Sequence, residues 1–337
     1  MRLRSPIDPP GSLSPDPERR GAGNVWGIIL AGGDGRRVRS LMRRLTGIDL
    51  PKQYCAVIGR RSMLQHTWDR AATLIPRHRI MTVITRHHLD QAWAQLQEWP
   101  TEQLLIQPSN RETAPGLLLP LLAIQARDPR ATVAIFPSDH FVEEESVFME
   151  HVEQAVHFLA DHPSLVLLLG IPPDRPETGY GWIQPGEELA RRMGFGLFQV
   201  RRFLEKPDPL VSEQFFLQGG LWNSLVLVGR VDTFLGHIRE ALPELWASFQ
   251  AVASALGTVI EARILEEVYG AIPARNLSAH LLEQVPHHLG VVPVKGVHWC
   301  DWGDEARIFG TLTRIGKAEE LMARLRETTR PPSREAA

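Results

Sequence analysis

The sequence predicts an α/β protein with a mixed, mostly parallel sheet that is flanked by helices and followed by a helical C-terminal part. The first observation is that short apolar runs alternate with segments of helical periodicity along the first half of the chain. This alternation is typical of βαβ units, whose strands lie parallel. The second observation is a glycine-rich segment directly after the first apolar run. Sheets of this kind bind ligands beyond the carboxyl ends of their strands, so the segment marks a candidate site.

Bulk composition excludes several classes of protein. A chain of 337 residues with 43% hydrophobic and 23% charged residues is typical of a soluble globular protein with a large core. Its net charge of −2 gives no bulk electrostatic reason to expect nucleic-acid or membrane partners. Two cysteines are too few for a disulfide framework, and no apolar run is long enough to span a membrane. The start lacks the apolar core of a secretory signal, so we expect a cytoplasmic protein.

The predicted elements of the first half follow from hydrophobic spacing. Continuous apolar runs predict strands that are buried on both faces, and apolar residues three and four apart predict amphipathic helices. The predicted strands cover residues 25–30, 80–84, 104–106, 131–136 and 165–169, and the predicted helices cover residues 62–74, 88–99, 116–127 and 146–159.

Beyond Gly170 the pattern weakens, because proline- and glycine-rich loops separate shorter segments. We expect strands at 200–204, 225–228 and 290–294, a helix at 210–217, and two or three helices within 231–269. No internal repeat divides the chain. Residues 1–23 are rich in proline, serine, arginine and glycine, which predicts a disordered tail. One domain should then cover residues 24–312, followed by a C-terminal helix and a frayed tail at 313–337.

The segment after the first predicted strand indicates a polyphosphate site. The segment contains three glycines, Gly32, Gly33 and Gly35, and two arginines, Arg36 and Arg37. Lys52 follows later in the chain and adds a third positive charge. Glycine lets backbone N–H groups approach an anion closely, because no Cβ blocks the way. A P-loop would need Gly-Lys-Ser/Thr, and a dinucleotide fingerprint would need glycine or alanine at Val38, so both motifs fail. An ordinary glycine turn stays open at this point.

Other polar clusters also follow predicted strands, and by themselves they are ambiguous. Asp139 and Asp301 each lie in a short polar turn, where aspartate is usually a turn former or helix cap but could also bind Mg²⁺. Thr113 could cap the helix that follows it. The Glu205-Lys206 step is typical of a solvated turn.

The combination of motifs resembles one family. The string 30–37, LAGGDGRR, followed by Pro51-Lys52, resembles the LAGGxGTRL and Pro-Lys signature of nucleotide-sugar pyrophosphorylases. Residues 137–140 resemble the family's P-x-D-H, and residues 299–303 resemble its W-x-D-x-G. Residues 107–115 are similar to the QPxxRxTAP segment of mannose-1-phosphate guanylyltransferases. Glu205-Lys206-Pro207 lies between a GYG at 179–181 and a WN at 222–223, in the family's order.

This resemblance, which spans residues 25–312, implies a Rossmann-like catalytic domain of the nucleotide-diphospho-sugar transferase type. It implies that GTP and mannose-1-phosphate react to GDP-mannose and pyrophosphate, with Mg²⁺ held by Asp139 and Asp301. The implied catalytic residues are Arg37, Lys52, Asp139 and Lys206. The implied nucleotide contacts are Ala31, Gly32, Gly33, Gly35, Arg36, Gln107, Arg111 and Thr113. The implied sugar-phosphate contacts are Gly181, Glu205, Lys206 and Asn223. Neither nucleic acid nor a membrane is implied as a partner, and a homo-oligomer stays open.

Several positions depart from the family pattern. Arg36 stands where the family usually has threonine, Leu225 replaces the glycine of WNSG, and Asp304 lies in the altered WSDVGSW ending. The segment after the signature is also unusually basic. These changes leave open another sugar or nucleotide, or a catalytically silent homologue that binds nucleotide sugars. No isomerase-like or β-helical segment follows residue 312, so a bifunctional form is not expected.

Overall fold

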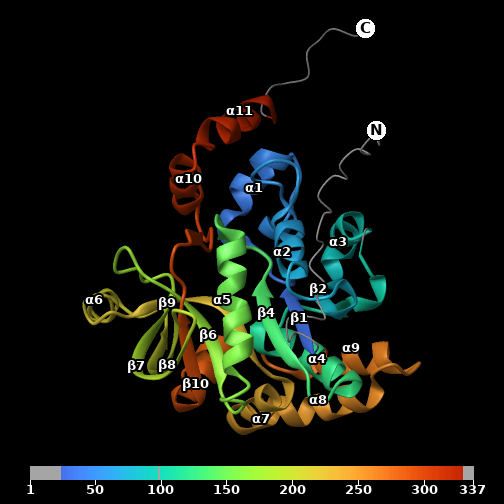
Figure 1. The fold of residues 1–337 in the computed structure, drawn as a ribbon. Helices are drawn as coiled ribbons and strands as arrows, with labels where there is room; N and C mark the ends of the chain where they lie inside the picture. The colour runs from blue at the N-terminus through green and yellow to red at the C-terminus, as the bar shows by residue number, and fades with distance from the viewer. Residues whose placement is uncertain (1–23, 98, 329–337) are drawn as a thin grey trace, which may run out of the picture.

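The computed structural model describes residues 24–97 and 99–328; the tail at 1–23 that we expected to be disordered and the end at 329–337 that we expected to be frayed lie outside them. Within the described residues, nine strands form one mixed sheet with helices on both faces (Figure 1). Strands β8 and β9 run opposite to the others, so the predicted mostly parallel α/β fold is confirmed. Across the sheet the order is β3 (Leu104–Gln107), β2 (Ile80–Thr85), β1 (Val25–Leu30), β4 (Thr132–Pro137), β9 (Leu221–Arg230), β6 (Val166–Ile171), β10 (Leu289–Pro293), β8 (Phe195–Glu205) and β7 (Gly181–Arg192).

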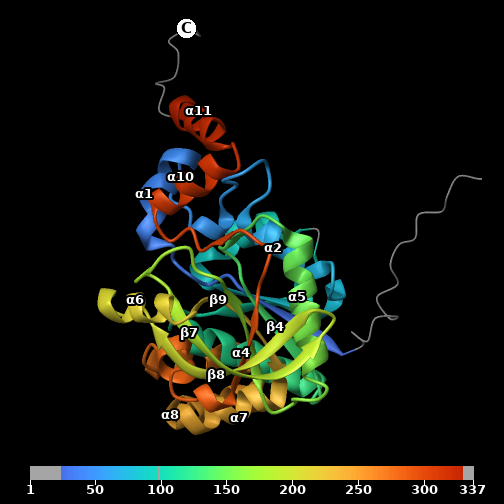
Figure 2. The same ribbon diagram turned by 60° about the vertical axis from the view of Figure 1, so that its left-hand side comes forward.

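Two hydrophobic layers enclose this sheet. One face packs against α4 (Thr113–Arg127), with α7 (Val231–Ala241), α8 (Pro243–Ala255) and α9 (Glu261–Ala271) beyond it. The other face packs against α2 (Met63–Ala72), α3 (Leu89–Gln95) and α5 (Glu145–Phe158). The short helix α6 (Pro209–Leu217) contacts β7 at the far end of the sheet (Figure 2).

A third, smaller core joins the two ends of the described chain. Helix α1 (Arg39–Thr46) packs against α11 (Ala318–Thr328), and α10 (Glu305–Arg314) contributes to the same cluster (Figure 1). The short strands β5 (Phe141–Val142) and β11 (Trp299–Cys300) pair beside it. The predicted boundary at residue 312 falls inside α10. This arrangement brings the segment around residue 301 next to the segment that follows β1.

The prediction missed the longest hairpin of the sheet. Strands β7 and β8 extend from 181 to 205, whereas the sequence predicted only a strand at 200–204. Many residues of β7 are exposed, so its apolar alternation is weak. The turn uses Met193 and Gly194, both with positive φ (50° and 89°). Asn-Gly is the usual sequence for a turn with two such residues, and methionine at the first position gives no turn signal.

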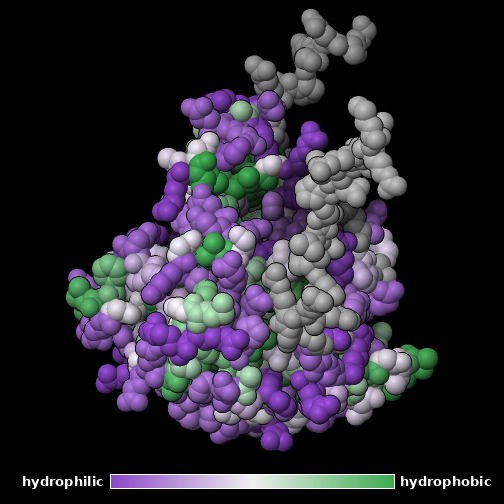
Figure 3. All heavy atoms as spheres, in the orientation of Figure 1, coloured by the Kyte–Doolittle hydropathy of each residue, from purple (hydrophilic) through white to green (hydrophobic). Residues whose placement is uncertain are grey.

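The surface agrees with the bulk composition. The face seen in Figure 1 is mainly hydrophilic, with small hydrophobic patches (Figure 3). One patch lies over α6, where Leu210 and Leu217 are 73% and 75% exposed. None of the described helices combines the length and the hydropathy that a membrane-spanning helix needs.

Candidate active site

The register of the sheet places the predicted site residues at one edge. Leu30 at the end of β1 pairs with Val83 of β2 and with Pro137 of β4. Thr85 at the end of β2 pairs with Gln107 at the end of β3. The loops that follow these four parallel strands therefore open on the same edge. A cleft of about 570 Å³ lies there, lined by the glycine-rich loop, Gln107, Thr113, Lys52 and Asp139 among others.

The glycine-rich loop presents free amides to this cleft. Among the described residues, the N–H groups of Gly32, Gly33 and Gly35 have no hydrogen-bond acceptor. The side chain of Gln53 donates to the carbonyl oxygens of Ala31 and Gly33, at 3.1 and 2.6 Å, which fixes the loop. Gly35 has a φ of 58°, and a Cβ there would lie 3.0 Å from the backbone nitrogen of Lys52. The loop is therefore suited to bind an anion through its backbone.

Lys52, which lines the cleft, contacts two other segments of the chain through its side chain. Its side chain is 4% exposed, and its Nζ lies 3.2 Å from Oδ2 of Asp139. The same ammonium group donates to the carbonyl oxygens of Asp301 and Trp302. All three of its protons thus have an acceptor. The side chain of Asp139 is 36% exposed and lines the cleft, so its carboxylate remains accessible from that side.

The carboxylate of Asp301 has several protein partners that the sequence did not predict. Its Oδ1 accepts from the Tyr180 hydroxyl at 3.2 Å, from the Gly303 N–H at 2.8 Å and from Nη1 of Arg307 at 3.0 Å. Its Oδ2 lies 3.1 Å from Nη1 of Arg307 and 3.9 Å from Nη2 of Arg37. Arg307 also binds Glu177 at 2.8 Å. Asp301 therefore acts as the counterion of a buried arginine.

The charges around Lys52 set the protonation of its neighbours. Burial raises the pKa of both aspartates, but the nearby Lys52 and His140, and Arg307 for Asp301, lower the pKa of each below its usual value. Burial lowers the pKa of His140, although Asp139 and Asp301 oppose this effect. At neutral pH the site therefore holds two carboxylates beside a neutral imidazole.

The four predicted sugar-phosphate residues come together in a second group. Gly181 pairs with Glu205 across the β7–β8 hairpin, and a Cβ at 181 would lie 2.7 Å from Oε2 of Glu205 and 3.3 Å from Cβ of Asn223. Nζ of Lys206 lies 2.8 Å from Oε1 of Glu205. None of the four lines the 570 Å³ cleft, but Leu225, two residues after Asn223, does. The group therefore adjoins the cleft through the start of β9.

Three predicted nucleotide contacts are placed differently from the rest. Ala31 is buried outside the cleft lining, and its carbonyl oxygen accepts from Gln53 and from the Tyr54 hydroxyl. Arg111 also lies outside the lining, and its Nε donates to the carbonyl oxygen of Tyr269 at 2.7 Å. Arg36 does line the cleft, but its side chain is 81% exposed and pairs with Asp34 at 3.2 Å.

Thr113 is not a helix cap. It is the first residue of α4, after Glu112 at the cap position, and its hydroxyl accepts from the N–H of Leu277 at 2.7 Å. It lines the cleft together with Gln107, whose Oε1 accepts from the Tyr269 hydroxyl at 3.2 Å. The capping alternative for Thr113 is therefore wrong.

Sequence reasoning missed two residues of the site. His140 belongs to the motif at 137–140 but was predicted to have no role of its own, yet its Nε2 lies 3.7 Å from Oδ1 of Asp139. Arg307 gave no sequence signal, because an arginine on an amphipathic helix is normally solvent-exposed. Its side chain is 9% exposed here, and its backbone N–H donates to Asp304, which caps α10.

The fold and the site define an α/β protein with a cleft at the carboxyl edge of its sheet, lined by a glycine-rich loop and charged side chains. Comparison with known proteins gives the family: the nucleotidyl transferase family model matches residues 26–308, and the chain belongs to that family. The predicted family is thereby confirmed.

Several known proteins resemble the chain. It is 31% identical over 280 residues to a mannose-1-phosphate guanylyltransferase of Klebsiella pneumoniae, covering 82% of this chain and 57% of that protein. It is 30% identical over 306 residues to the xanthan biosynthesis protein XanB of Xanthomonas campestris pv. campestris, covering 87% and 61%. The chain thus spans about 60% of the length of these curated relatives. A solved structure from Thermus thermophilus, described as a mannose-1-phosphate geranyltransferase, shares the fold with a TM-score of 0.71 at 24% identity, covering 87% of this chain and 79% of that one.

Proposed function

We propose that the protein is a sugar-1-phosphate nucleotidyltransferase that uses GTP and mannose-1-phosphate and releases pyrophosphate and GDP-mannose. The observation that carries this proposal is the meeting of free glycine-loop amides with the Lys52–Asp139 pair in one cleft. The polar group formed by Glu205 and Lys206, with Gly181 and Asn223, adjoins this cleft through Leu225. The relatives named as mannose-1-phosphate guanylyltransferases favour mannose and guanine.

The reaction needs positioning and charge neutralisation. A phosphate oxygen of the sugar-1-phosphate attacks the α-phosphorus of GTP, the bond from that phosphorus to the α–β bridging oxygen breaks, and pyrophosphate leaves. The amides of Gly32, Gly33 and Gly35, with Arg37, bind the triphosphate. Lys206 binds the sugar phosphate, while Glu205 and Asn223 bind sugar hydroxyls.

The carboxylates around the cleft fit a magnesium ion unequally. Asp139 fits well, because its carboxylate faces the cleft and is 36% exposed. Asp301 offers mainly Oδ2, whose neighbours are Arg307 at 3.1 Å and Arg37 at 3.9 Å. These two residues would hold the ion, which when bound offsets the charge of the phosphates.

The test is a panel of nucleoside triphosphates and sugar-1-phosphates, with pyrophosphate release as the readout. We expect the highest kcat/KM with GTP and mannose-1-phosphate; a higher value with another pair would move the assignment to that sugar or nucleotide. Asp139→Ala and Asp301→Ala should abolish turnover, whereas Asp161→Ala, at an exposed position, should not. Near-normal turnover by either Asp139→Ala or Asp301→Ala would contradict the metal assignment.

A second candidate function is favoured by Arg307. Because Arg307 contacts both oxygens of Asp301, this carboxylate has reduced capacity for a metal. A catalytically silent homologue would bind nucleotide or nucleotide sugar without metal-dependent pyrophosphate release. Calorimetric binding of GTP and GDP-mannose, measured beside the panel, separates the two functions. We place either function in the cytoplasm.

A further inference from the structure

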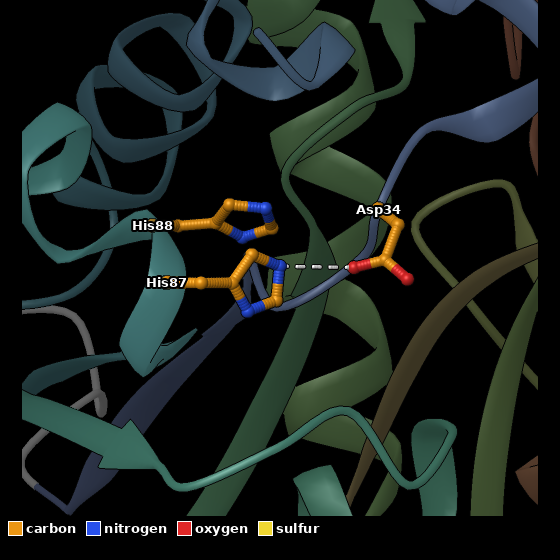
Figure 4. Close-up of side chains that lie close together, drawn as sticks. All are labelled: Asp34, His87 and His88. Carbon is orange, nitrogen blue, oxygen red and sulfur yellow. Dashed lines mark hydrogen bonds and ion pairs between the residues drawn. The ribbon is translucent and has the colours of Figure 1, made fainter. Parts of the chain in front are cut away.

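Three side chains with metal-ligating atoms lie close together at the glycine-rich loop, and none of them has a role in the proposed reaction. Asp34 comes from that loop, and His87 and His88 come from the 3-10 turn Arg86–His88 that follows β2. One ligand atom from each residue lies within 4.8 Å of the other two. Figure 4 shows the two imidazole rings on one side and the carboxylate facing them.

Hydrogen bonding fixes the free nitrogen of His88. The hydroxyl of Thr85 donates its single proton to the carbonyl oxygen of Gly32, at 3.0 Å. It must therefore accept in its second contact, which is with Nδ1 of His88 at 3.0 Å. Nδ1 then carries the proton, and the lone pair of the neutral ring is on Nε2. Metal-binding histidines are oriented in this way, by a hydrogen bond from their other nitrogen.

The burial of His88 agrees with that arrangement. Its side chain is buried, and the hydrogen bond between Nδ1 and Thr85 holds the ring in one orientation. His87 is 55% exposed, so an ion can reach the cluster from solvent.

The spacing suits a tetrahedral transition-metal ion. Zinc bonds of about 2.1 Å at tetrahedral angles place neighbouring ligand atoms about 3.4 Å apart. Nε2 of His87 lies 3.2 Å from Oδ1 of Asp34, close to that separation. Two imidazoles and one carboxylate favour a borderline ion such as zinc over Mg²⁺, which prefers an all-oxygen shell.

Arg36 gains a role in this cluster. It binds the second carboxylate oxygen of Asp34, with Nη2 3.2 Å from Oδ2, which turns Oδ1 toward His87. The charged residue that replaces the family's usual threonine thus acts as an outer-shell partner of the carboxylate.

We propose that Asp34, His87 and His88 form a zinc site that fastens the glycine-rich loop to the end of β2. Zinc binding fixes Asp34, which lines the cleft, and so restricts the backbone that faces the triphosphate. This site is separate from the Asp139–Asp301 pair and does not depend on the proposed transferase activity.

Calorimetric titration of metal-free protein with ZnSO₄, in the absence of nucleotide and sugar phosphate, tests the site. We expect His87→Gln and His88→Gln each to bind one zinc ion fewer than the wild type, and Arg36→Gln to bind about tenfold more weakly. His66→Gln, at an exposed position of α2, should match the wild type. Zinc should also slow amide hydrogen exchange at 32–36 in the wild type but not in His87→Gln.

Because His88 is buried, its variant could fail to fold, whereas His87 is exposed and its variant keeps the test decisive. Unchanged zinc stoichiometry and affinity in His87→Gln would overturn the proposal, and so would a wild type that binds no zinc. Zinc binding with no pyrophosphate release would refute the transferase function alone.

Discussion

Arg307 binds Asp301 through two contacts of 3.0 and 3.1 Å, and it also binds Glu177 at 2.8 Å. Its guanidinium carbon lies 4.3 Å from the centre of the Tyr180 ring. Arg307→Met keeps much of the length of the side chain and removes its charge. We expect this change to lower the free energy of unfolding substantially, because two largely buried carboxylates lose their cation.

The magnitude follows from burial. Removing one partner of a buried ion pair costs about 3–5 kcal/mol, because the remaining charge stays desolvated. The side chains of Asp301 and Glu177 are 12% and 17% exposed, so neither is fully desolvated. Methionine also replaces part of the apolar packing. We therefore expect a loss of about 3 kcal/mol at pH 7.

The loss of stability in Arg307→Met should depend on pH, in a direction that follows from the pKa of Asp301. Burial raises the pKa of Asp301, and the neighbouring His140, Arg307 and Lys52 more than reverse this effect, so the folded-state pKa lies below the unfolded value. The resulting stability is present above the unfolded pKa and is lost as pH falls through the folded pKa. The difference between wild type and Arg307→Met should therefore shrink below pH ~4.

Urea unfolding followed by tryptophan fluorescence at several pH values measures both effects. Arg263→Met is the matched control, because Arg263 is 68% exposed and lies 3.8 Å from Glu267 on α9. That control should change stability by no more than about 0.5 kcal/mol. A loss below about 1 kcal/mol for Arg307→Met, or a loss independent of pH, would refute the buried counterion assignment.

Three further predictions concern other parts of the molecule. Lys206→Met should raise the KM for the sugar phosphate at least about tenfold and leave the KM for the nucleotide nearly unchanged. Steady-state kinetics with each substrate varied in turn measures both values. An equal rise in both would contradict a role of Lys206 in binding the sugar phosphate. Gly35→Ala should lower the free energy of unfolding in urea by about 1 kcal/mol more than Gly59→Ala. Both positions have a positive φ, but only a Cβ at position 35 would crowd a backbone nitrogen. Equal losses of stability would count against that contact. Burial raises the pKa of the Cys55 thiol to about 12 and also raises the pKa of the Cys300 thiol. Both cysteines should therefore react with a disulfide reagent at pH 8 only after unfolding. Rapid reaction of the native protein would contradict their burial.

The sequence predicted the central strands well, and most of the candidate site residues that follow them lie close together. Strands β1, β2, β4 and β6 are continuous apolar runs that are buried on both faces, a pattern that few other structures produce. The predicted ends agree with the observed ones to within one or two residues. Because parallel strands end at one edge of a sheet, the loops after them lie close together, and they line one cleft.

Contacts between distant segments could not be predicted in the same way. The Arg307–Asp301 contact depends on how α10 begins, and the His87–Asp34 contact joins residues that are 53 positions apart. The β7–β8 hairpin was missed because its pairing, rather than its local pattern, holds it together. Such features follow from tertiary packing, which overrides weak local propensities.

The strained backbone positions bear on the choice between an active and a silent protein. Among the described residues, Leu225 and four other non-glycine residues have positive φ, and all but Met193 lie at the cleft or the sugar-phosphate group: Glu112, Lys206, Leu225 and Trp302. Such strain persists only where surrounding structure imposes it. Leu225, with a φ of 57°, therefore keeps the conformation that suits the family's glycine.

The other two departures are also accommodated by the structure. Asp304 caps α10, as the serine of the family pattern could, and Arg36 pairs with Asp34. Each of the three substitutions that suggested a silent homologue is therefore accommodated by local contacts or by backbone conformation. The remaining argument for that alternative is the contact between Arg307 and Asp301. If Asp301 must bind a metal for turnover, Arg307→Met should increase the affinity of the folded protein for Mn²⁺, whereas a purely structural pair predicts no increase.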